Sequence, residues 1–153
     1  MDNVIVPGLL SILAALIGGL IAIYIPRRNA RRDAGHQLIA EFAALEADFN
    51  RIAYSDTRAI DPILREAFPR LETQINIFKR HLYWWEKRSF TKAWIAYYNA
   101  YGDNRCQCYH HYLPFKGEYF EFGKLISSND NTKKYKINFK NNVENILKYA
   151  KQV

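Results

Sequence analysis

Cysteine is scarce in this sequence, which contains only Cys106 and Cys108, separated by one residue. A disulfide between them would close a small, strained ring, and two cysteines do not form the framework of a disulfide-rich secreted domain. The scarcity of cysteine therefore favours reduced thiols in a cytosolic domain.

The sequence also lacks the motifs of common catalytic and nucleotide-binding sites. It contains no glycine-rich phosphate loop and no dinucleotide fingerprint. No glutamate is followed three residues later by histidine, the pairing that di-metal helical bundles use. We therefore expect a protein that is not an enzyme and has no cofactor, with a metal- or thiol-dependent enzyme as the less favoured alternative.

Soft metal ligands cluster only at Cys106, Cys108, His110 and His111. Thiolates and imidazoles suit tetrahedral zinc, but zinc knuckles leave at least two residues between their cysteines. The spacing thus argues against a metal site. It favours a loop at the end of a bundle, in which the cysteines pack as small apolar residues.

Charge is absent from the 22 residues Val4–Ile25, and Pro26 follows them directly. At ~1.5 Å per residue, a helix of this length covers the ~30 Å hydrocarbon core of a bilayer. A cleavable signal peptide would carry its basic residues before the apolar run, whereas here Asp2 precedes the run and arginines follow it. Residues 1–26 are therefore predicted to form a transmembrane anchor.

Four arginines follow the anchor in a predicted basic juxtamembrane segment, residues 27–35. Basic residues beside a span predict the cytoplasmic side, so the N-terminus should face outward and the domain inward, in a bacterial-type inner membrane. Eight lysines from Lys116 to Lys151 add to the net charge of +7, and the anionic cytoplasmic leaflet is their simplest partner. The predicted lipid-headgroup contacts are Arg27, Arg28, Arg31 and Arg32.

Small residues recur every fourth position within the predicted anchor. Such lines let two helix backbones approach closely in lipid, which predicts self-association; the abundance of alanine and glycine in membrane helices is the alternative explanation. The two lines are Ser11, Ala15 and Gly19, and Ala14, Gly18 and Ala22.

The remaining residues, 36–153, suffice for one domain, and their apolar residues follow helical four-three spacing in four stretches. This pattern predicts an all-α fold: the anchor, then a small cytoplasmic bundle with a long irregular connection over residues 104–134, containing at most a short strand at Tyr119–Phe122. The four apolar seams are Leu38–Ile52, Leu64–Trp85, Phe90–Tyr101 and Tyr135–Ala150.

Several residues predict where these helices begin, bend or end. Pro69 predicts a kink or a helix that ends near Phe68, with the following helix running to about Lys87. Ser89 is a predicted cap of the third helix, and Pro26 and Gly35 are predicted bends of the first. The basic C-terminal helix is expected to join the bundle rather than lie on the membrane.

Bases and aromatic residues alternate over residues 79–94, a mixture that single-stranded nucleic-acid binders use. Leu82, Trp85 and Trp94 fall on the apolar seams and are predicted core residues. Tyr83 and Trp84 lie beside the seam and are predicted to form a partner-binding surface or a membrane-interface belt. Nucleic acid is accordingly the less favoured partner.

These features predict a single-pass membrane protein that acts as an interaction or scaffolding module at the cytoplasmic face, binding lipids and either another protein or itself. The alternative is a membrane-acting effector of the toxin or phage-exclusion type that works through assembly of its anchors. Ser11 and Tyr24 are the polar residues of the span, so a conducting pore would have little to line it.

Overall fold

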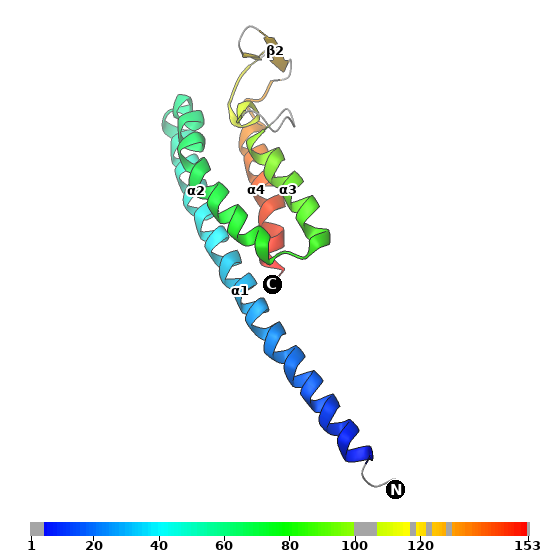
Figure 1. Cartoon of the computed structure of the whole chain (residues 1–153). Helices are drawn as coiled ribbons and strands as arrows, with labels where there is room; N and C mark the ends of the chain where they lie inside the picture. Colours follow the sequence, from blue (N-terminus) through cyan, green and yellow to red (C-terminus); the bar gives the residue numbers. More distant parts are fainter. Residues whose placement is uncertain (1–4, 100–106, 117–118, 122–123, 128–129, 153) are drawn as a thin grey trace.

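The computed structural model describes residues 5–99, 107–116, 119–121, 124–127 and 130–152, and the chain is mostly helical, as predicted (Figure 1). Its long helices are α1 (Ile5–Ser55), α2 (Ile60–His81), α3 (Trp84–Tyr98) and α4 (Tyr135–Lys151). The short elements are the 3₁₀ turns η1 (Thr57–Ala59) and η2 (His110–Tyr112) and the strands β1 (Tyr119–Glu121) and β2 (Lys124–Ser127).

Helix α1 is 51 residues long and has two different halves. Its N-terminal half projects alone from the molecule, and every side chain from Ser11 to Asn29 is exposed (Figure 1). Its C-terminal half packs against α2 and α4. Among the helices in the described part of the chain, α1 is the one long and apolar enough to cross a membrane.

Helix α1 ends before Asp56. This residue has an extended backbone, and its carboxylate accepts a hydrogen bond from the backbone N–H of Arg58 at 3.0 Å, which caps the turn η1. The chain then reverses direction, so that α2 runs back along α1 (Figure 1). This hairpin brings the end of α2 to the middle of α1.

Aromatic rings fill the centre of the bundle. Phe49 of α1 stacks on Phe139 of α4, with ring centroids 4.0 Å apart, and Phe42 meets Tyr97 of α3 edge to face at 5.6 Å. The predicted seams are confirmed at all but a few positions. Their buried members are Leu38, Phe42, Leu45, Phe49, Leu64, Phe68, Leu71, Ile75, Phe78, Leu82, Phe90, Trp94, Tyr97, Tyr135, Phe139, Val143, Ile146 and Ala150.

Gly35 marks a place where α4 packs closely on α1. A Cβ atom at this position would lie 3.3 Å from the carbonyl oxygen of Ala150 and 3.5 Å from the ring of Phe78. Glycine therefore permits the close approach of the two helices. The expectation that the C-terminal helix joins the bundle is confirmed.

Of the two alternatives predicted for Pro69, a helix that ends near Phe68 is wrong, and a kink stays a prediction. Pro69 lies inside α2 on its exposed face, where the carbonyl group that loses its helical N–H partner can be solvated. One turn later, the hydroxyl of Thr73 donates a hydrogen bond to the Pro69 carbonyl at 2.9 Å. The helix continues to His81, six residues short of the predicted end.

The turn between α2 and α3 lies at Leu82 and Tyr83, within the range that the sequence assigned to one helix. Glu86, three residues into the new helix, accepts a hydrogen bond from the backbone N–H of Tyr83 at 2.9 Å and so caps α3. Ser89 lies within the helix and does not cap it. Trp85 is 58% exposed, and its predicted place in the core is wrong because the new helix starts a new register.

A short hairpin interrupts the predicted irregular connection. Strands β1 and β2 pair antiparallel, with Phe120 opposite Leu125 and Glu121 opposite Lys124. The predicted short strand is thus confirmed at Tyr119–Glu121, and it has a partner that the sequence did not indicate. The hairpin lies at the end of the bundle away from the projecting half of α1 (Figure 1).

Replacing Phe139 with alanine should lower the free energy of unfolding by about 3–5 kcal/mol, because it removes a fully buried ring and leaves a cavity beside Phe49. Urea denaturation of the full chain in detergent micelles, followed by tryptophan fluorescence, measures this loss. Ile137→Ala is the matched control on the same helix, since Ile137 is 58% exposed. Equal losses in both variants would contradict the assigned core.

Candidate functional site

A cavity of about 550 Å³ lies where the projecting half of α1 joins the bundle. We call it the junction pocket. One wall belongs to α1, and the other belongs to the turn between α2 and α3. Its lining residues are Tyr24, Arg27, Arg28, Arg31, Arg80, His81, Leu82, Tyr83, Trp84, Lys87 and Gln152.

An ion pair ties the two walls of the junction pocket together. The guanidinium of Arg31 donates from Nη1 and Nη2 to the two carboxylate oxygens of Glu86, at 3.0 and 2.7 Å. Both side chains are largely buried, and the guanidinium carbon lies 5.2 Å from the ring centroid of Tyr83. Arg31, a predicted headgroup contact, is thus engaged within the fold.

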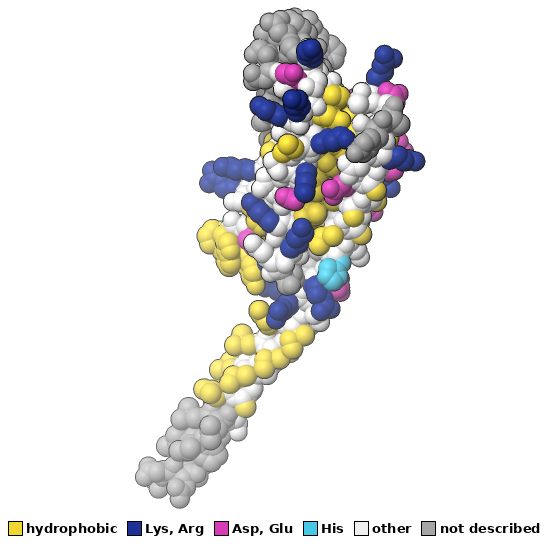
Figure 2. All heavy atoms as spheres, turned by 180° about the vertical axis from the view of Figure 1, so that it is seen from behind, with side chains coloured by type: hydrophobic (Ala, Val, Ile, Leu, Met, Phe, Trp, Pro, Cys, Tyr) yellow, Lys and Arg dark blue, Asp and Glu magenta, His cyan; other side chains and the backbone are white. Residues whose placement is uncertain are grey.

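Four further cations line the pocket without a carboxylate partner among the described residues. Arg27 and Arg28 extend from α1, while Arg80 and Lys87 come from the two sides of the α2–α3 turn. Lys and Arg side chains gather where the apolar half of α1 meets the bundle (Figure 2). Such a concentration of one sign of charge attracts anions. Arg32, the remaining predicted headgroup contact, is exposed and lies 3.8 Å from Asp33.

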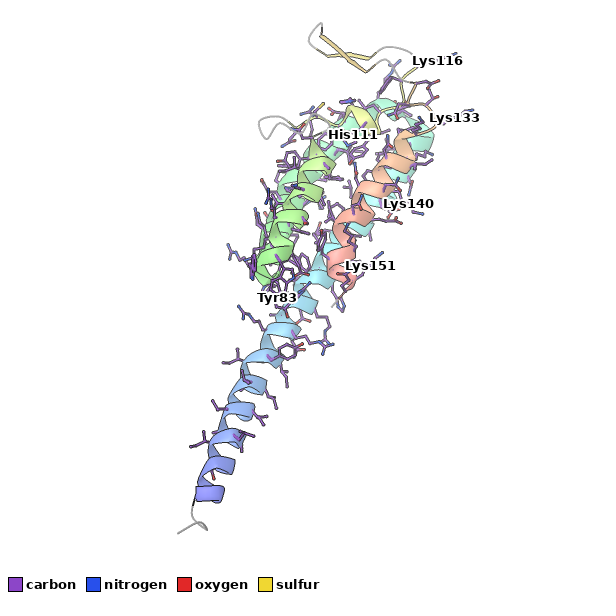
Figure 3. The ribbon with its side chains drawn as sticks, turned by 90° about the vertical axis from the view of Figure 1, so that its right-hand side faces the viewer. Tyr83, His111, Lys116, Lys133, Lys140 and Lys151 are labelled. Atoms are coloured by element: carbon purple, nitrogen blue, oxygen red, sulfur yellow. The ribbon has the colours of Figure 1, made fainter. Side chains whose placement is uncertain are left out.

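Exposed aromatic rings border the same pocket. Tyr83, Trp84 and Trp85 are 46%, 80% and 58% exposed. Tyr83 stacks on Trp85 with centroids 4.7 Å apart, and Trp84 meets Trp85 edge to face at 5.7 Å. Figure 3 shows Tyr83 at the end of the bundle beside the projecting helix. The structure therefore brings the predicted Tyr83 and Trp84 surface next to the predicted headgroup arginines.

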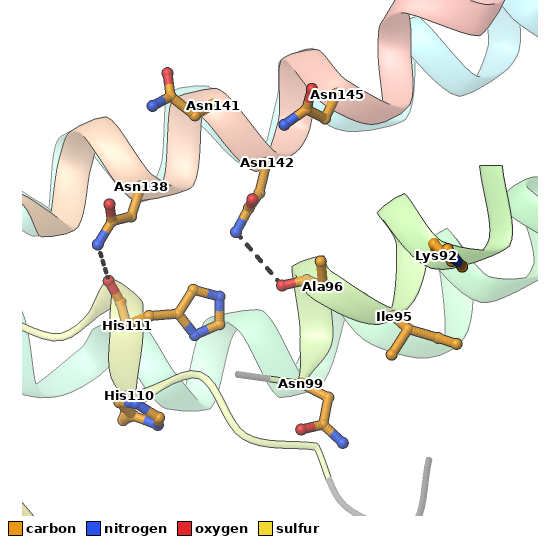
Figure 4. Close-up of a pocket in the computed structure, with 10 residues that line it drawn as sticks. All are labelled: Lys92, Ile95, Ala96, Asn99, His110, His111, Asn138, Asn141, Asn142 and Asn145. Atoms are coloured by element: carbon orange, nitrogen blue, oxygen red, sulfur yellow. Dashed lines mark hydrogen bonds between the residues drawn. The ribbon is translucent and has the colours of Figure 1, made fainter. Parts of the chain in front are cut away.

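A second hollow, an open groove of about 950 Å³, lies between α3 and α4 (Figure 4). We call it the asparagine groove because asparagine amides supply half of its lining. Among the residues that the structure describes, Lys92 is the one lysine or arginine in that lining. The full set is Lys92, Ile95, Ala96, Asn99, His110, His111, Asn138, Asn141, Asn142 and Asn145.

Some of the late asparagines have structural roles that the sequence did not reveal. The buried Asn131 donates from Nδ2 to the carbonyls of His111 and Leu113, both at 2.9 Å. Asn138 donates to the same His111 carbonyl at 3.1 Å, and Asn142 donates to the Tyr112 hydroxyl at 2.9 Å (Figure 4 shows the former bond). These bonds hold residues 111–113 against α4.

Asn141 and Asn145 are exposed along the groove and make none of these bonds to residues 111–113. Each amide presents both a hydrogen-bond donor and an acceptor. The groove is therefore suited to a polar ligand with donors and acceptors of its own.

The His111 side chain points into the space between η2, α3 and α4 (Figure 4). Both ring nitrogens are buried, and neither forms a hydrogen bond of good geometry with a described residue, although the backbone carbonyls of Tyr97 and Ala96 lie nearby. Burial, aided by repulsion from the neighbouring His110, lowers the pKa of His111 from 6.5 to about 4, while the backbone carbonyls of Tyr97 and Ala96 oppose this shift. His111 is thus neutral at physiological pH.

The structure brings two members of the cysteine–histidine cluster, Cys108 and His110, into contact. Cys108 is buried, and its Sγ lies 3.2 Å from Nδ1 of His110. Within the described ranges, no three histidine, cysteine, aspartate or glutamate side chains converge to hold a metal ion. Cys106 lies outside the described residues.

The predicted small-residue lines lie on the projecting half of α1. A Cβ atom added at Gly18 or Gly19 would meet no other atom within 4 Å. The side chains of Ser11, Ala14, Ala15 and Ala22 are likewise exposed. Self-association through this face stays a prediction.

Comparison with known proteins finds no matching family model, no matching curated protein and no matching solved structure.

Sequence reasoning missed Arg80, Lys87 and Glu86 as members of the junction site. The first two are separated from the arginines of α1 by some 50 residues, and only the helical hairpin brings them together. The capping role of Glu86 could have been predicted, because a glutamate at the third position of a helix is part of a capping pattern. No pattern in the sequence connected Glu86 to Arg31.

The buried neutral state of His111 predicts a pH-dependent stability. Because its folded pKa of about 4 lies below its ordinary value of 6.5, protons bind the unfolded chain more tightly. This contribution is complete above about pH 6.5 and falls by at most ~3 kcal/mol as the pH drops through 4, at ~1.4 kcal/mol per pKa unit. Urea midpoints between pH 7 and pH 4 measure the loss. The dependence of the midpoint on pH should be weaker in His111→Gln.

A titration of histidine ring resonances by NMR provides a second reading for His111. Two results together would contradict the buried neutral state: a ring that titrates near the ordinary value of 6.5, and a urea midpoint whose dependence on pH is the same in His111→Gln as in wild type.

Proposed function

We propose that this chain is a single-pass membrane protein whose helical domain lies at the cytoplasmic face and acts there as an interaction module. The observation that carries the proposal is the course of α1, which is apolar and exposed in its first half and forms part of the bundle core in its second. One helix thus serves both as the anchor and as the first helix of the domain.

The exposed apolar surface of α1 favours a bilayer as its environment. Large side chains such as Ile12, Leu16 and Leu20 are 61–68% exposed, at a cost of ~25 cal/mol for each Å² of apolar surface left in water. From Ile5 to Ile25 the helix has 21 residues, or about 31 Å at ~1.5 Å per residue. This length matches the ~30 Å hydrocarbon core.

Charge and aromatic residues support the cytoplasmic placement of the domain. Arg27 and Arg28 directly follow the apolar half of α1, and basic residues beside a span favour the cytoplasmic side. Tyr83 and Trp84 line the junction pocket together with these arginines, and Trp85 stacks on Tyr83. Exposed tyrosine and tryptophan side chains are typical of the boundary between membrane and water, which favours this role over a protein-binding surface.

The asparagine groove is the surface that we assign to a protein partner. It lies between α3 and α4 (Figure 4), and its lining shares no residue with that of the junction pocket, so a cytosolic partner could reach it. Its amides pair well with the donors and acceptors of a polar chain segment. Because α1 is unbroken and Arg31 is bonded to Glu86, the groove would be held at a fixed height above the membrane.

The open small-residue face of α1 favours a second candidate, an effector that acts through assembly of its anchors. Gly18 and Gly19 contact nothing else in the chain, so a second helix could approach them closely. This candidate places the activity in the membrane, whereas the interaction module places it in the groove.

A measurement of membrane orientation tests the proposed anchor. Replacing Arg27, Arg28 and Arg32 with glutamine should convert a uniform N-out orientation into a mixture, because the charge bias beside the span is lost. Arg31 is left unchanged, because its ion pair with Glu86 joins α1 to α3. Reporter fusions at the C-terminus and labelling of an N-terminal cysteine from outside the cell measure the orientation. Arg51, Arg58 and Arg70, replaced together, form the control. A wild-type chain released from membranes by alkaline extraction would refute the anchor.

Site-specific photo-crosslinking tests the groove. A crosslinking residue at Asn145 should yield a discrete adduct with a second protein in intact cells, whereas one at Lys140, exposed on the same helix outside the groove, should yield none. The adduct should persist in Gly18→Leu. An adduct of two copies of this chain that Gly18→Leu abolishes, with no adduct to another protein, would favour the effector instead.

A further inference from the structure

We infer that the junction pocket is a binding site for the phosphate headgroup of an anionic phospholipid. The inference rests on the proposed function, because it requires α1 to span the membrane. It goes further by naming a ligand class and by assigning cations of the α2–α3 turn to the site.

The charge of the pocket suits a phosphate group. Arg27, Arg28, Arg80 and Lys87 approach it from two sides, and no acidic side chain of the described residues lines it. Guanidinium groups bind phosphate oxygens through paired hydrogen bonds, and lysine adds a point charge. Glu86, the nearest acidic group that the structure shows at this site, is neutralised by its two bonds to Arg31.

The level of the pocket along α1 matches that of the headgroups. Arg27 and Arg28 follow Ile25 by two and three residues, which places them about 3–5 Å beyond the apolar segment. The headgroup layer extends about 5–8 Å beyond the hydrocarbon core on each side of a bilayer. A phosphate between these arginines would therefore occupy its normal depth in the membrane.

The aromatic rings add a place for the rest of the lipid. Trp84 lines the pocket and is 80% exposed, and Tyr24 lines it from the end of the apolar segment. Such amphipathic rings are favoured where acyl chains meet headgroups. A lipid whose phosphate binds the cations can thus place its glycerol backbone and upper chains against these rings.

The pocket is also organised before any ligand binds. The bidentate Arg31–Glu86 pair joins α1 to the start of α3, and Glu86 in turn caps that helix through the Tyr83 N–H. The two walls therefore keep their spacing, and less ordering is needed on binding. A phosphate on a soluble molecule has the same headgroup chemistry, but it would leave the aromatic rim uncovered.

Native mass spectrometry of the full chain in nanodiscs tests the inference. The discs contain phosphatidylcholine alone or phosphatidylcholine mixed with phosphatidylglycerol. We expect wild type to retain phosphatidylglycerol in the mixed discs. Arg80→Gln with Lys87→Gln should reduce retention about tenfold, because each cation near the surface contributes measurably to anionic lipid binding. These two residues lie outside the anchor and its flanking segment, so the variant preserves the orientation signal.

The matched control is Lys133→Gln with Lys140→Gln, which removes the same charge from exposed positions away from Tyr83 (Figure 3). It should retain phosphatidylglycerol as wild type does. Equal retention in all three proteins, or equal losses in both double variants, would overturn a specific site. Both results would leave the anchor intact, whereas failure of wild type to insert into the discs would refute the proposed function itself.

A further arm separates the two sources of phosphate. Glycerol 3-phosphate is added in excess to wild type in phosphatidylcholine discs and in mixed discs. We expect it neither to bind in the former nor to displace lipid in the latter. Retention of glycerol 3-phosphate that the Arg80→Gln and Lys87→Gln variant abolishes would overturn the lipid assignment in favour of a soluble phosphate.

Discussion

The unbroken course of α1 through Pro26 is the constraint on which the rest of the structure depends. The helix enters the bundle without a linker, so the direction of its apolar half fixes the direction of every helix packed on its second half. Gly35 sits just inside the bundle and lets α4 come within contact distance of the α1 backbone. The base of the domain is therefore built directly on the continuation of the apolar segment.

The Arg31–Glu86 pair completes this base. It lies one turn beyond Arg27 and Arg28 and joins α1 to the first turn of α3. A largely buried pair of this kind contributes less to stability than to geometry, because desolvation offsets much of its attraction. Its effect here is to hold the α2–α3 turn, with its exposed rings and cations, against α1. The same contact leaves the neighbouring cations without an acidic partner in the described part of the chain.

The parts of the fold that follow helical periodicity could be predicted from sequence, whereas the turns and the site could not. The apolar seam residues between Leu38 and Phe49 and between Tyr135 and Ala150 are buried as their spacing predicts, because one buried stripe is enough to identify a helix. The turn at Leu82 escaped prediction because Trp85 happens to continue the old spacing into the new helix. Asn131 and Arg80 escaped because their partners lie far away in the chain, and only tertiary contacts reveal them.

The choice of arginine at the junction follows from these contacts. Arg31 must satisfy both oxygens of Glu86 while lying against the ring of Tyr83, and a planar guanidinium can do both. A lysine would offer a compact charge that could meet one oxygen at a time. The same planar geometry at Arg27, Arg28 and Arg80 suits the tetrahedral oxygens of a phosphate. Arginines that, by our proposal, orient the chain in the membrane would thus also shape the pocket in which the proposed headgroup lies.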